Sequence, residues 1–234
     1  MAVPWCAVAG RTRAGRPRRF VRNQAMGGRY TMGIVTPLPT GRLVGKRIGI
    51  LLESDFVEEE IGYYQRRFAE EGAGVELLTR LWGRPSLTFT GHGHRAALEV
   101  AGDLEALDYH ELSQLAALLV PSGMVADRLR YSENVEQDPP ALELMRRAFR
   151  MPHLVKAFSS HGLLLLSRAP DLLRERPVAC HNNVAADVRN MGAVYLNQDV
   201  VVDRDLVTCR TVEHCHLLAR TVIERLSTPR GAAA

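Results

Sequence analysis

The chain has 234 residues, of which 46% are hydrophobic, 24% charged and 6% aromatic, and its formal net charge is +4. This composition suits one globular domain and argues against overall disorder, a disulfide scaffold, collagen and a coiled coil. The apolar run Leu163–Leu166 falls far short of the roughly 20 residues that a membrane span needs, so we expect no membrane partner.

Residues 1–44 are predicted to form a basic leader and linker that is disordered, because they combine Gly, Pro and Arg without apolar periodicity. Seven arginines fall within residues 1–31, and without them the net charge changes from +4 to −3. Three interpretations remain open: an arm that touches nucleic acid or an anionic surface, a transit peptide, or a segment without function that is either unstructured or never made, with Met26 or Met32 as the true start.

The first elements of the domain follow this leader. A branched apolar run at Arg47–Leu52 predicts a buried strand. A helix is expected from about Glu58 to Glu71, with one apolar face, and a strand at Val75–Thr79. The Gly-rich, β-leaning segment Trp82–Val100 predicts a hairpin.

Strands and helices then alternate to the end of the chain. The expected elements are strand Ala116–Val120, helix Pro140–Arg150, strand Leu154–Ser159, helix Gly162–Arg168, strand Val178–Cys180, helix Ala185–Asn190, paired strands Val200–Asp203 and Leu206–Thr208, and helix Val212–Leu226. This alternation predicts an α/β three-layer sandwich over residues 45–228, a mostly parallel sheet with helices on both faces. Residues 229–234 are expected to be a disordered tail.

Open parallel sheets bind ligands beyond the carboxyl ends of their strands, which directs attention to the turn after Leu154–Ser159. Only one or two residues join this strand to the next helix, and Ser160 lies at the apex. Such a turn strains the backbone and projects the side chain over the sheet beside a helix N-terminus, as in a nucleophile elbow. From spacing alone, Ser159 or Ser160 as a helix N-cap is the simpler interpretation.

Several motifs follow one another in a characteristic order. They are Ile48–Ile61, Trp82–Val100, Val120–Gly123 followed by Asp127–Arg130, Ser160–Gly162, Asp187–Ala193, Val200–Asp203 and Leu206–Thr211. In this order they resemble the PfpI-like branch of the ThiJ/PfpI superfamily, which has a flavodoxin-like, class I glutamine-amidotransferase-like fold. The resemblance extends from about Lys46 to Leu226.

The resemblance implies a catalytic cysteine at the elbow, a glutamate that hydrogen-bonds it, and backbone N–H groups that hold an oxyanion. The glutamate matches Glu60, with Glu58 and Glu59 as competitors that could instead complement the helix dipole. The oxyanion loop matches Ser122 and Gly123, the elbow histidine matches His161, and His181 resembles a second histidine near the nucleophile. The resemblance also implies a homodimer or larger assembly, a small carbonyl- or amide-type substrate, and neither metal nor organic cofactor.

Two departures from the family pattern affect the chemistry. Ser160 replaces the cysteine, and Ser122 replaces the first glycine of a pair. Since a hydroxyl needs an adjacent base to act as a nucleophile, three possibilities stay open. Ser160 could be a nucleophile with His161 or His181 as base, Glu60 could perform acid–base chemistry of the hydrolase, hydratase or lyase type, or the site could belong to an inactive small-molecule-binding or chaperone-like protein.

The remaining histidines and cysteines are weaker candidates. His92 and His94 could chelate a metal if they share a strand face, whereas His214 and His216 are expected to flank an exposed turn. The four cysteines have no C-x-x-C spacing, which favours free thiols in a reducing, cytoplasmic compartment over a zinc site. No phosphate loop, dinucleotide fingerprint or aromatic platform for nucleic acid is present, so nucleic acid is not an expected partner of the domain.

Overall fold

The computed structural model describes residue 33 and residues 35–228. The predictions for residues 1–32 and for the tail at 229–234 lie outside the described residues. No helix in the described part is both long and apolar enough to cross a membrane.

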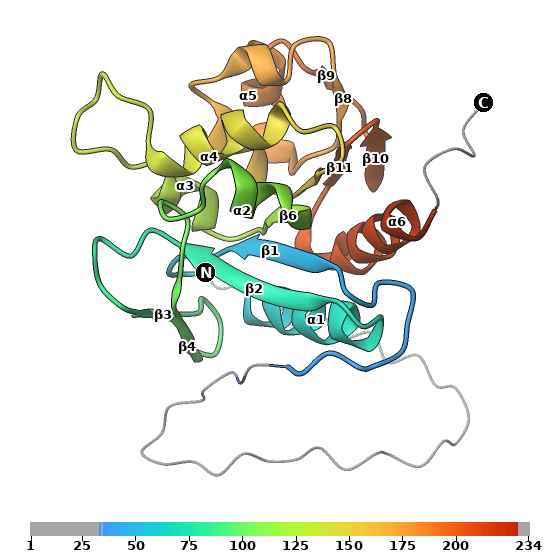
Figure 1. Ribbon diagram of the computed structural model, residues 1–234. Coiled ribbons are helices and arrows are strands. Elements are labelled where there is room, and N and C mark those ends of the chain that lie inside the picture. The colour runs from blue at the N-terminus through green and yellow to red at the C-terminus, as the bar shows by residue number, and fades with distance from the viewer. Residues whose placement is uncertain (1–32, 34, 229–234) are drawn as a thin grey trace, which may run out of the picture.

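A seven-stranded sheet forms the centre of the domain (Figure 1). Its order is β10 (Val200–Asp203), β11 (Leu206–Cys209), β7 (Val155–Ser159), β6 (Leu115–Val120), β1 (Arg47–Leu51), β2 (Gly74–Thr79) and β5 (Gly102–Asp103). All neighbours run parallel except β10 and β11, which form an antiparallel pair at one edge. Two small sheets lie outside it, the hairpin of β3 (Leu87–Thr90) and β4 (Ala97–Val100) and the pair β8 (Pro177–Val178) and β9 (Val194–Tyr195).

Helices cover both faces of the sheet, which confirms the predicted three-layer α/β sandwich. Helices α1 (Glu58–Glu70) and α6 (Cys215–Ser227) pack together on one face (Figure 1). The opposite face carries α2 (Tyr109–Ser113), α3 (Val125–Leu129), α4 (Pro140–Phe149), α5 (Ala185–Asn190) and the short 3-10 helix η1 (Gly162–Leu166). Within residues 35–228 there are three further short 3-10 helices, η2 (Pro170–Leu172), η3 (Asn182–Val184) and η4 (Val212–His214).

The core follows from the local patterns. Ile61, Tyr64 and Phe68 form the apolar face of α1 and are fully buried. Residues Ile48–Leu51 of β1 are buried on both sides, as expected of a central parallel strand. The first turn of α1 is acidic, with Glu58, Glu59 and Glu60 in succession, and these negative charges complement the helix dipole.

The structure corrects two predicted boundaries. The expected α-helix at Gly162–Arg168 is the five-residue 3-10 helix η1. The chain packs tightly there, since a Cβ on Gly162 would lie 2.8 Å from the carbonyl oxygen of Val120. The packed chain also begins before residue 45, because Leu43 is fully buried and the Leu38 N–H donates to the Ala69 carbonyl at 2.9 Å.

Candidate functional site

Ser160 lies at the apex of the turn between β7 and η1, in the left-handed backbone region with a φ of 55°. This conformation is costly for a residue with a side chain, and it persists only where surrounding contacts enforce it. Two backbone hydrogen bonds provide these enforcing contacts. The Ser160 N–H donates to the carbonyl of Cys209 at 3.0 Å, and the Ser160 carbonyl accepts from the N–H of His181 at 3.2 Å. The elbow is therefore held by two segments distant in sequence.

The Ser160 hydroxyl has a histidine partner. Its Oγ lies 3.1 Å from Nδ1 of His161, whose ring stacks on the ring of His181 with a centroid separation of 4.7 Å. Burial, aided by the neighbouring His181, lowers the pKa of His161. A neutral imidazole with an unprotonated Nδ1 can accept the Ser160 proton, so this pair satisfies the first geometric requirement of an activated serine.

His181 is itself oriented by the backbone. Its Nδ1 accepts a hydrogen bond from the N–H of Asn183 at 3.2 Å, an interaction that places its own proton on Nε2. Both histidine side chains are half-buried, whereas Ser160 is 6% exposed. The two rings therefore form the accessible part of this site.

Glu60 is completely buried and is surrounded by hydroxyl groups. Its Oε1 accepts from the Tyr64 hydroxyl at 2.9 Å, and its Oε2 accepts from the Ser122 N–H at 2.9 Å and from the Ser122 hydroxyl. The nearby Ser159 hydroxyl also favours the charged form and lowers the pKa of Glu60. Burial raises the pKa of Glu60 despite these hydrogen bonds, because desolvation disfavours the charged carboxylate.

The hydrogen bonds of the described residues do not join Glu60 to Ser160, although the resemblance implied that contact. One Glu60 oxygen is instead occupied by the hydroxyl of Ser122, the residue that departs from the family's glycine. Because Glu60 has no exposed surface, a substrate cannot reach it in this structure. Glu60 thus contacts Ser122 in the loop after β6 rather than the elbow hydroxyl.

The loop after β6 also differs from the expected arrangement. The Ser122 N–H is already donated to Glu60, so it is not available to an oxyanion. The N–H groups of Gly123 and His161 make no hydrogen bond to any residue the structure describes. Gly123 has a φ of 76°, and a Cβ there would lie 2.6 Å from the Asp55 carbonyl oxygen, so only glycine fits. These two amides are therefore free of protein acceptors among the described residues, whereas the Ser122 amide is not.

The acidic residues that competed with Glu60 hold the β3–β4 turn instead. Glu58 accepts from the N–H groups of Gly93 at 2.9 Å and His94 at 2.8 Å. Burial alone would raise the pKa of Glu58, but these backbone hydrogen bonds lower it on balance. Glu59 is exposed and lies 2.9 Å from Nε2 of His94. Of the three, Glu60 is the one joined to the loops around Ser160.

The other histidines are dispersed. His92 and His94 lie in the exposed turn between β3 and β4, so they do not share a strand face. His214 pairs with the Thr211 hydroxyl at 2.9 Å, and His216 is exposed. Within residues 35–228, no group of three or more His, Cys, Asp or Glu side chains is placed to hold a metal ion.

The thiols near the site are not reactive. Cys209 is fully buried with its Sγ 3.4 Å from the Ser159 hydroxyl, and burial raises its pKa to about 12. Burial also raises the pKa of the half-buried Cys215 to about 12. Neither thiol supplies a thiolate at neutral pH, so neither substitutes for the missing elbow cysteine.

Tyr64 and Ser159 are partners of Glu60 that the sequence analysis missed. Tyr64 lies four residues after Glu60, a spacing that brings two side chains together on a helix, so its signal was present in the sequence. Ser159 gave no such signal, because its side chain meets Glu60 only once β1 and β7 lie in one sheet.

Together, the parallel sheet and the strained serine turn define a class of protein: α/β sandwiches with a nucleophile-elbow type of site. The chain belongs to the DJ-1/PfpI family, whose sequence model matches residues 46–225. It is 28% identical over 184 residues to protein/nucleic acid deglycase 2 of Escherichia coli, covering 78% of this chain and 99% of the relative. It is also 28% identical over 169 residues to general stress protein 18 of Bacillus subtilis, covering 72% and 90%.

Solved structures share the fold. A two-domain protein from Anabaena variabilis with DJ-1/ThiJ/PfpI-like and ferritin-like domains matches with a TM-score of 0.68 and 22% identity, over 80% of this chain and 52% of that protein. The chain thus spans about half of that protein. DJ-1 of Schizosaccharomyces pombe matches with a TM-score of 0.63 and 14% identity, over 78% of this chain and 93% of that one. At these identities the likeness establishes the fold alone.

Proposed function

We propose that the protein is an enzyme with hydrolase-type chemistry on a small carbonyl- or amide-type substrate, and that Ser160 is its nucleophile. The observation that carries this proposal is the 3.1 Å contact between Ser160 Oγ and His161 Nδ1 on a strained elbow. A serine hydroxyl is a weak nucleophile on its own, and an adjacent neutral imidazole is the usual means of activating it.

The steps follow from the named atoms. Ser160 Oγ bonds to the carbonyl carbon while its proton moves to His161 Nδ1, and the carbonyl electron pair shifts to oxygen. The Gly123 and His161 amides donate to that oxygen, since they have no other partner among the described residues. With an amide, the returning electron pair expels the amine, which takes the proton from His161. Water then hydrolyses the Ser160 ester by the same sequence.

Glu60 is a positioning residue in this proposal. It is fully buried and bonded to Ser122 in the loop after β6, and it lies near Ser159, the residue before the elbow. Removing its carboxyl group is expected to shift the loop after β6 and the elbow. It should therefore change kcat, while His161 would still accept the proton of Ser160.

The substrate panel follows from the relatives. The E. coli relative is named a protein/nucleic acid deglycase, and we therefore include amines modified by methylglyoxal, together with free methylglyoxal, small amides and p-nitrophenyl acetate. The variants are Ser160→Ala, His161→Gln and Glu60→Gln, with Ser132→Ala as the matched control because Ser132 is an exposed-loop serine whose hydroxyl bonds only to a neighbouring carbonyl.

The decisive measurement is mass spectrometry of the intact protein after p-nitrophenyl acetate. We expect an acetyl adduct on Ser160, unchanged in Ser132→Ala, absent in Ser160→Ala and formed roughly 10²–10⁴-fold more slowly in His161→Gln. An adduct that persists in Ser160→Ala would refute the serine nucleophile. Turnover lost only in Glu60→Gln would instead support acid–base chemistry without a nucleophile.

One observation favours a second candidate, a catalytically inactive small-molecule-binding protein. Both Glu60 oxygens are occupied by protein donors, and one of these donors is the Ser122 amide expected at an oxyanion site. A well-folded wild type that binds members of the panel in calorimetry, yet forms no adduct and turns none of them over, would support this alternative.

A further inference from the structure

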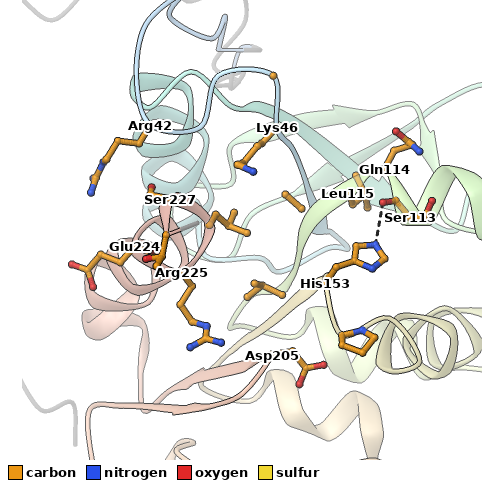
Figure 2. A pocket seen from close by; sticks show the side chains of 16 residues that line it. Arg42, Lys46, Ser113, Gln114, Leu115, His153, Asp205, Glu224, Arg225 and Ser227 are labelled. Carbon is orange, nitrogen blue, oxygen red and sulfur yellow. Dashed lines mark hydrogen bonds between the residues drawn. The ribbon is translucent and has the colours of Figure 1, made fainter. Parts of the chain in front are cut away.

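A large open cavity lies at the amino ends of the parallel strands, whereas Ser160 lies at their carboxyl ends. The cavity has a volume of about 980 Å³ (Figure 2). Its walls come from the beginnings of the parallel strands, namely Lys46 before β1, Leu115 in β6 and Val155 in β7, and from the last turn of α6. The elbow follows the carboxyl end of β7. The length of a five- or six-residue strand, roughly 15–20 Å, therefore separates the two sites.

Two cations of this cavity have no anionic partner. Lys46 and Arg225 form no ion pair with any residue the structure describes. Figure 2 shows both side chains extending into the space between α6 and the strand starts, whereas the Glu224 carboxylate points away from it. Residues 1–32 and 229–234 contain no Asp or Glu.

The acidic groups at the rim are already paired. Asp205 lines the cavity, but its carboxylate binds the ammonium of Lys156 and, at 2.8 Å, the guanidinium of Arg176. Glu224 lies 3.7 Å from Arg220. The third cation of the lining, Arg42, is bonded to Glu71 at 2.6 Å and contributes little net charge. The uncompensated charge in the cavity is therefore positive and comes from Lys46 and Arg225.

The cavity also has an apolar wall. Leu115, Ala116, Pro152, Val155 and Leu226 lie along it beside polar groups of Ser113 and Gln114. The volume falls within the range of small-molecule sites, in which an apolar wall holds the body of a ligand and a few charged groups orient it.

We propose that this cavity binds a phosphate monoester with an apolar body, independently of the elbow. Two uncompensated positive charges match the two negative charges of a phosphate monoester at neutral to alkaline pH. The Arg225 guanidinium can donate two parallel hydrogen bonds to phosphate oxygens, and the Lys46 ammonium adds a compact charge. The apolar body lies on the wall that Ala116, Pro152 and Leu226 provide, because these three are the apolar lining residues with exposed surface.

The test is calorimetric titration of the full chain with phenyl phosphate at pH 8, beside phenol, inorganic phosphate and benzoate. We expect one saturable site for phenyl phosphate, with affinity lower by about tenfold or more in Lys46→Gln and in Arg225→Gln, because each loses a charge-assisted hydrogen bond. Arg66→Gln is the matched control, since Arg66 is an exposed helical arginine that lies outside the cavity lining and forms no ion pair with any described residue. Thermal melting checks that all variants fold.

A chemical readout at Lys46 makes the location explicit. The chain has two lysines, and Lys156 is completely buried, so Lys46 is the side chain that an amine reagent can reach. Phenyl phosphate should slow acetylation of Lys46, followed by mass spectrometry, in the wild type and equally in Ser160→Ala.

Several results would overturn the proposal. These are no binding of phenyl phosphate, equal affinity for inorganic phosphate, equal affinity for benzoate, equal weakening by Arg66→Gln, or unprotected Lys46 at saturation. Loss of binding in Ser160→Ala would place the ligand at the elbow instead. Failure of the serine mechanism leaves this test unaffected, because the two sites share no residue.

Discussion

Replacing Tyr64 with Phe removes one hydroxyl group from the buried cluster around Glu60 and leaves the rest of the packing intact. The hydroxyl lies 2.9 Å from Glu60 Oε1, and both side chains have no exposed surface. Burial raises the pKa of Tyr64 well above its ordinary value, so the hydroxyl remains a donor. Phe retains the ring that stacks on Phe68 at 6.0 Å.

The expected cost follows from the charge of the acceptor. A hydrogen bond to an ionised group stabilises a fold by about 1.5–3 kcal/mol, and one to a neutral group by about 1 kcal/mol. Because Glu60 has a raised pKa, we expect a loss of about 1–2 kcal/mol in the free energy of unfolding of Tyr64→Phe at pH 7. For a domain of this size the loss corresponds to a fall in Tm of roughly 2–8 °C.

Urea unfolding at pH 7 measures this loss, with Tyr63→Phe as the matched control. Tyr63 precedes Tyr64 on α1, is half-buried, and its hydroxyl makes no hydrogen bond within the described chain. A double-mutant cycle with Glu60→Met isolates the pair. The reasoning fails if Tyr64→Phe costs no more than Tyr63→Phe, or if its cost is unchanged when Glu60 is already Met.

Three further outcomes are expected. The folded-state pKa of Glu60 exceeds its ordinary value of 4.5, so the free energy of unfolding should fall as the pH rises through that folded pKa. Tm measured from pH 5 to 8 should therefore fall less in Glu60→Gln than in the wild type, and parallel curves for the two proteins would contradict this. Gly123→Ala should lower the free energy of unfolding more than Gly83→Ala does, with a difference of about 2 kcal/mol or more. Both glycines have a positive φ, but only at Gly123 would the new Cβ lie 2.6 Å from a carbonyl oxygen. Equal Tm values for the two variants would exclude that clash. Lys156→Met should cost about 1.5–3 kcal/mol in urea unfolding, because it removes a charged hydrogen bond to Asp205 while Arg176 still pairs with that carboxylate; a loss below about 1 kcal/mol would show that the Lys156 pair adds little.

The strands and helices that carry the site were predictable because their signals are local. The apolar run before Glu53 became β1, and the 3.6-residue spacing of Ile61, Tyr64 and Phe68 became the buried face of α1. The 3-10 helix η1 was not predictable from its leucine-rich run, because its geometry depends on the close approach of Gly162 to β6.

The candidate site divides in the same way. The position of Ser160 between a strand and a helix follows from the sequence, and so does the neighbouring His161. The Glu60 contacts do not, since Ser122 is 62 residues away and its hydroxyl takes a carboxylate oxygen that the resemblance assigned to the elbow. A substitution of glycine by serine shows that a hydroxyl is present, but not which acceptor it reaches.

The sequence by itself determined the order of elements, the α/β class and the serine at the turn, because periodicity and turn chemistry act over a few residues. Only the tertiary structure decided that Glu60 contacts Ser122 rather than Ser160, and that Lys46 and Arg225 line one cavity. Those contacts join segments that are far apart in the chain. Their partners are selected by strand order and by competition among buried donors, which no local pattern encodes.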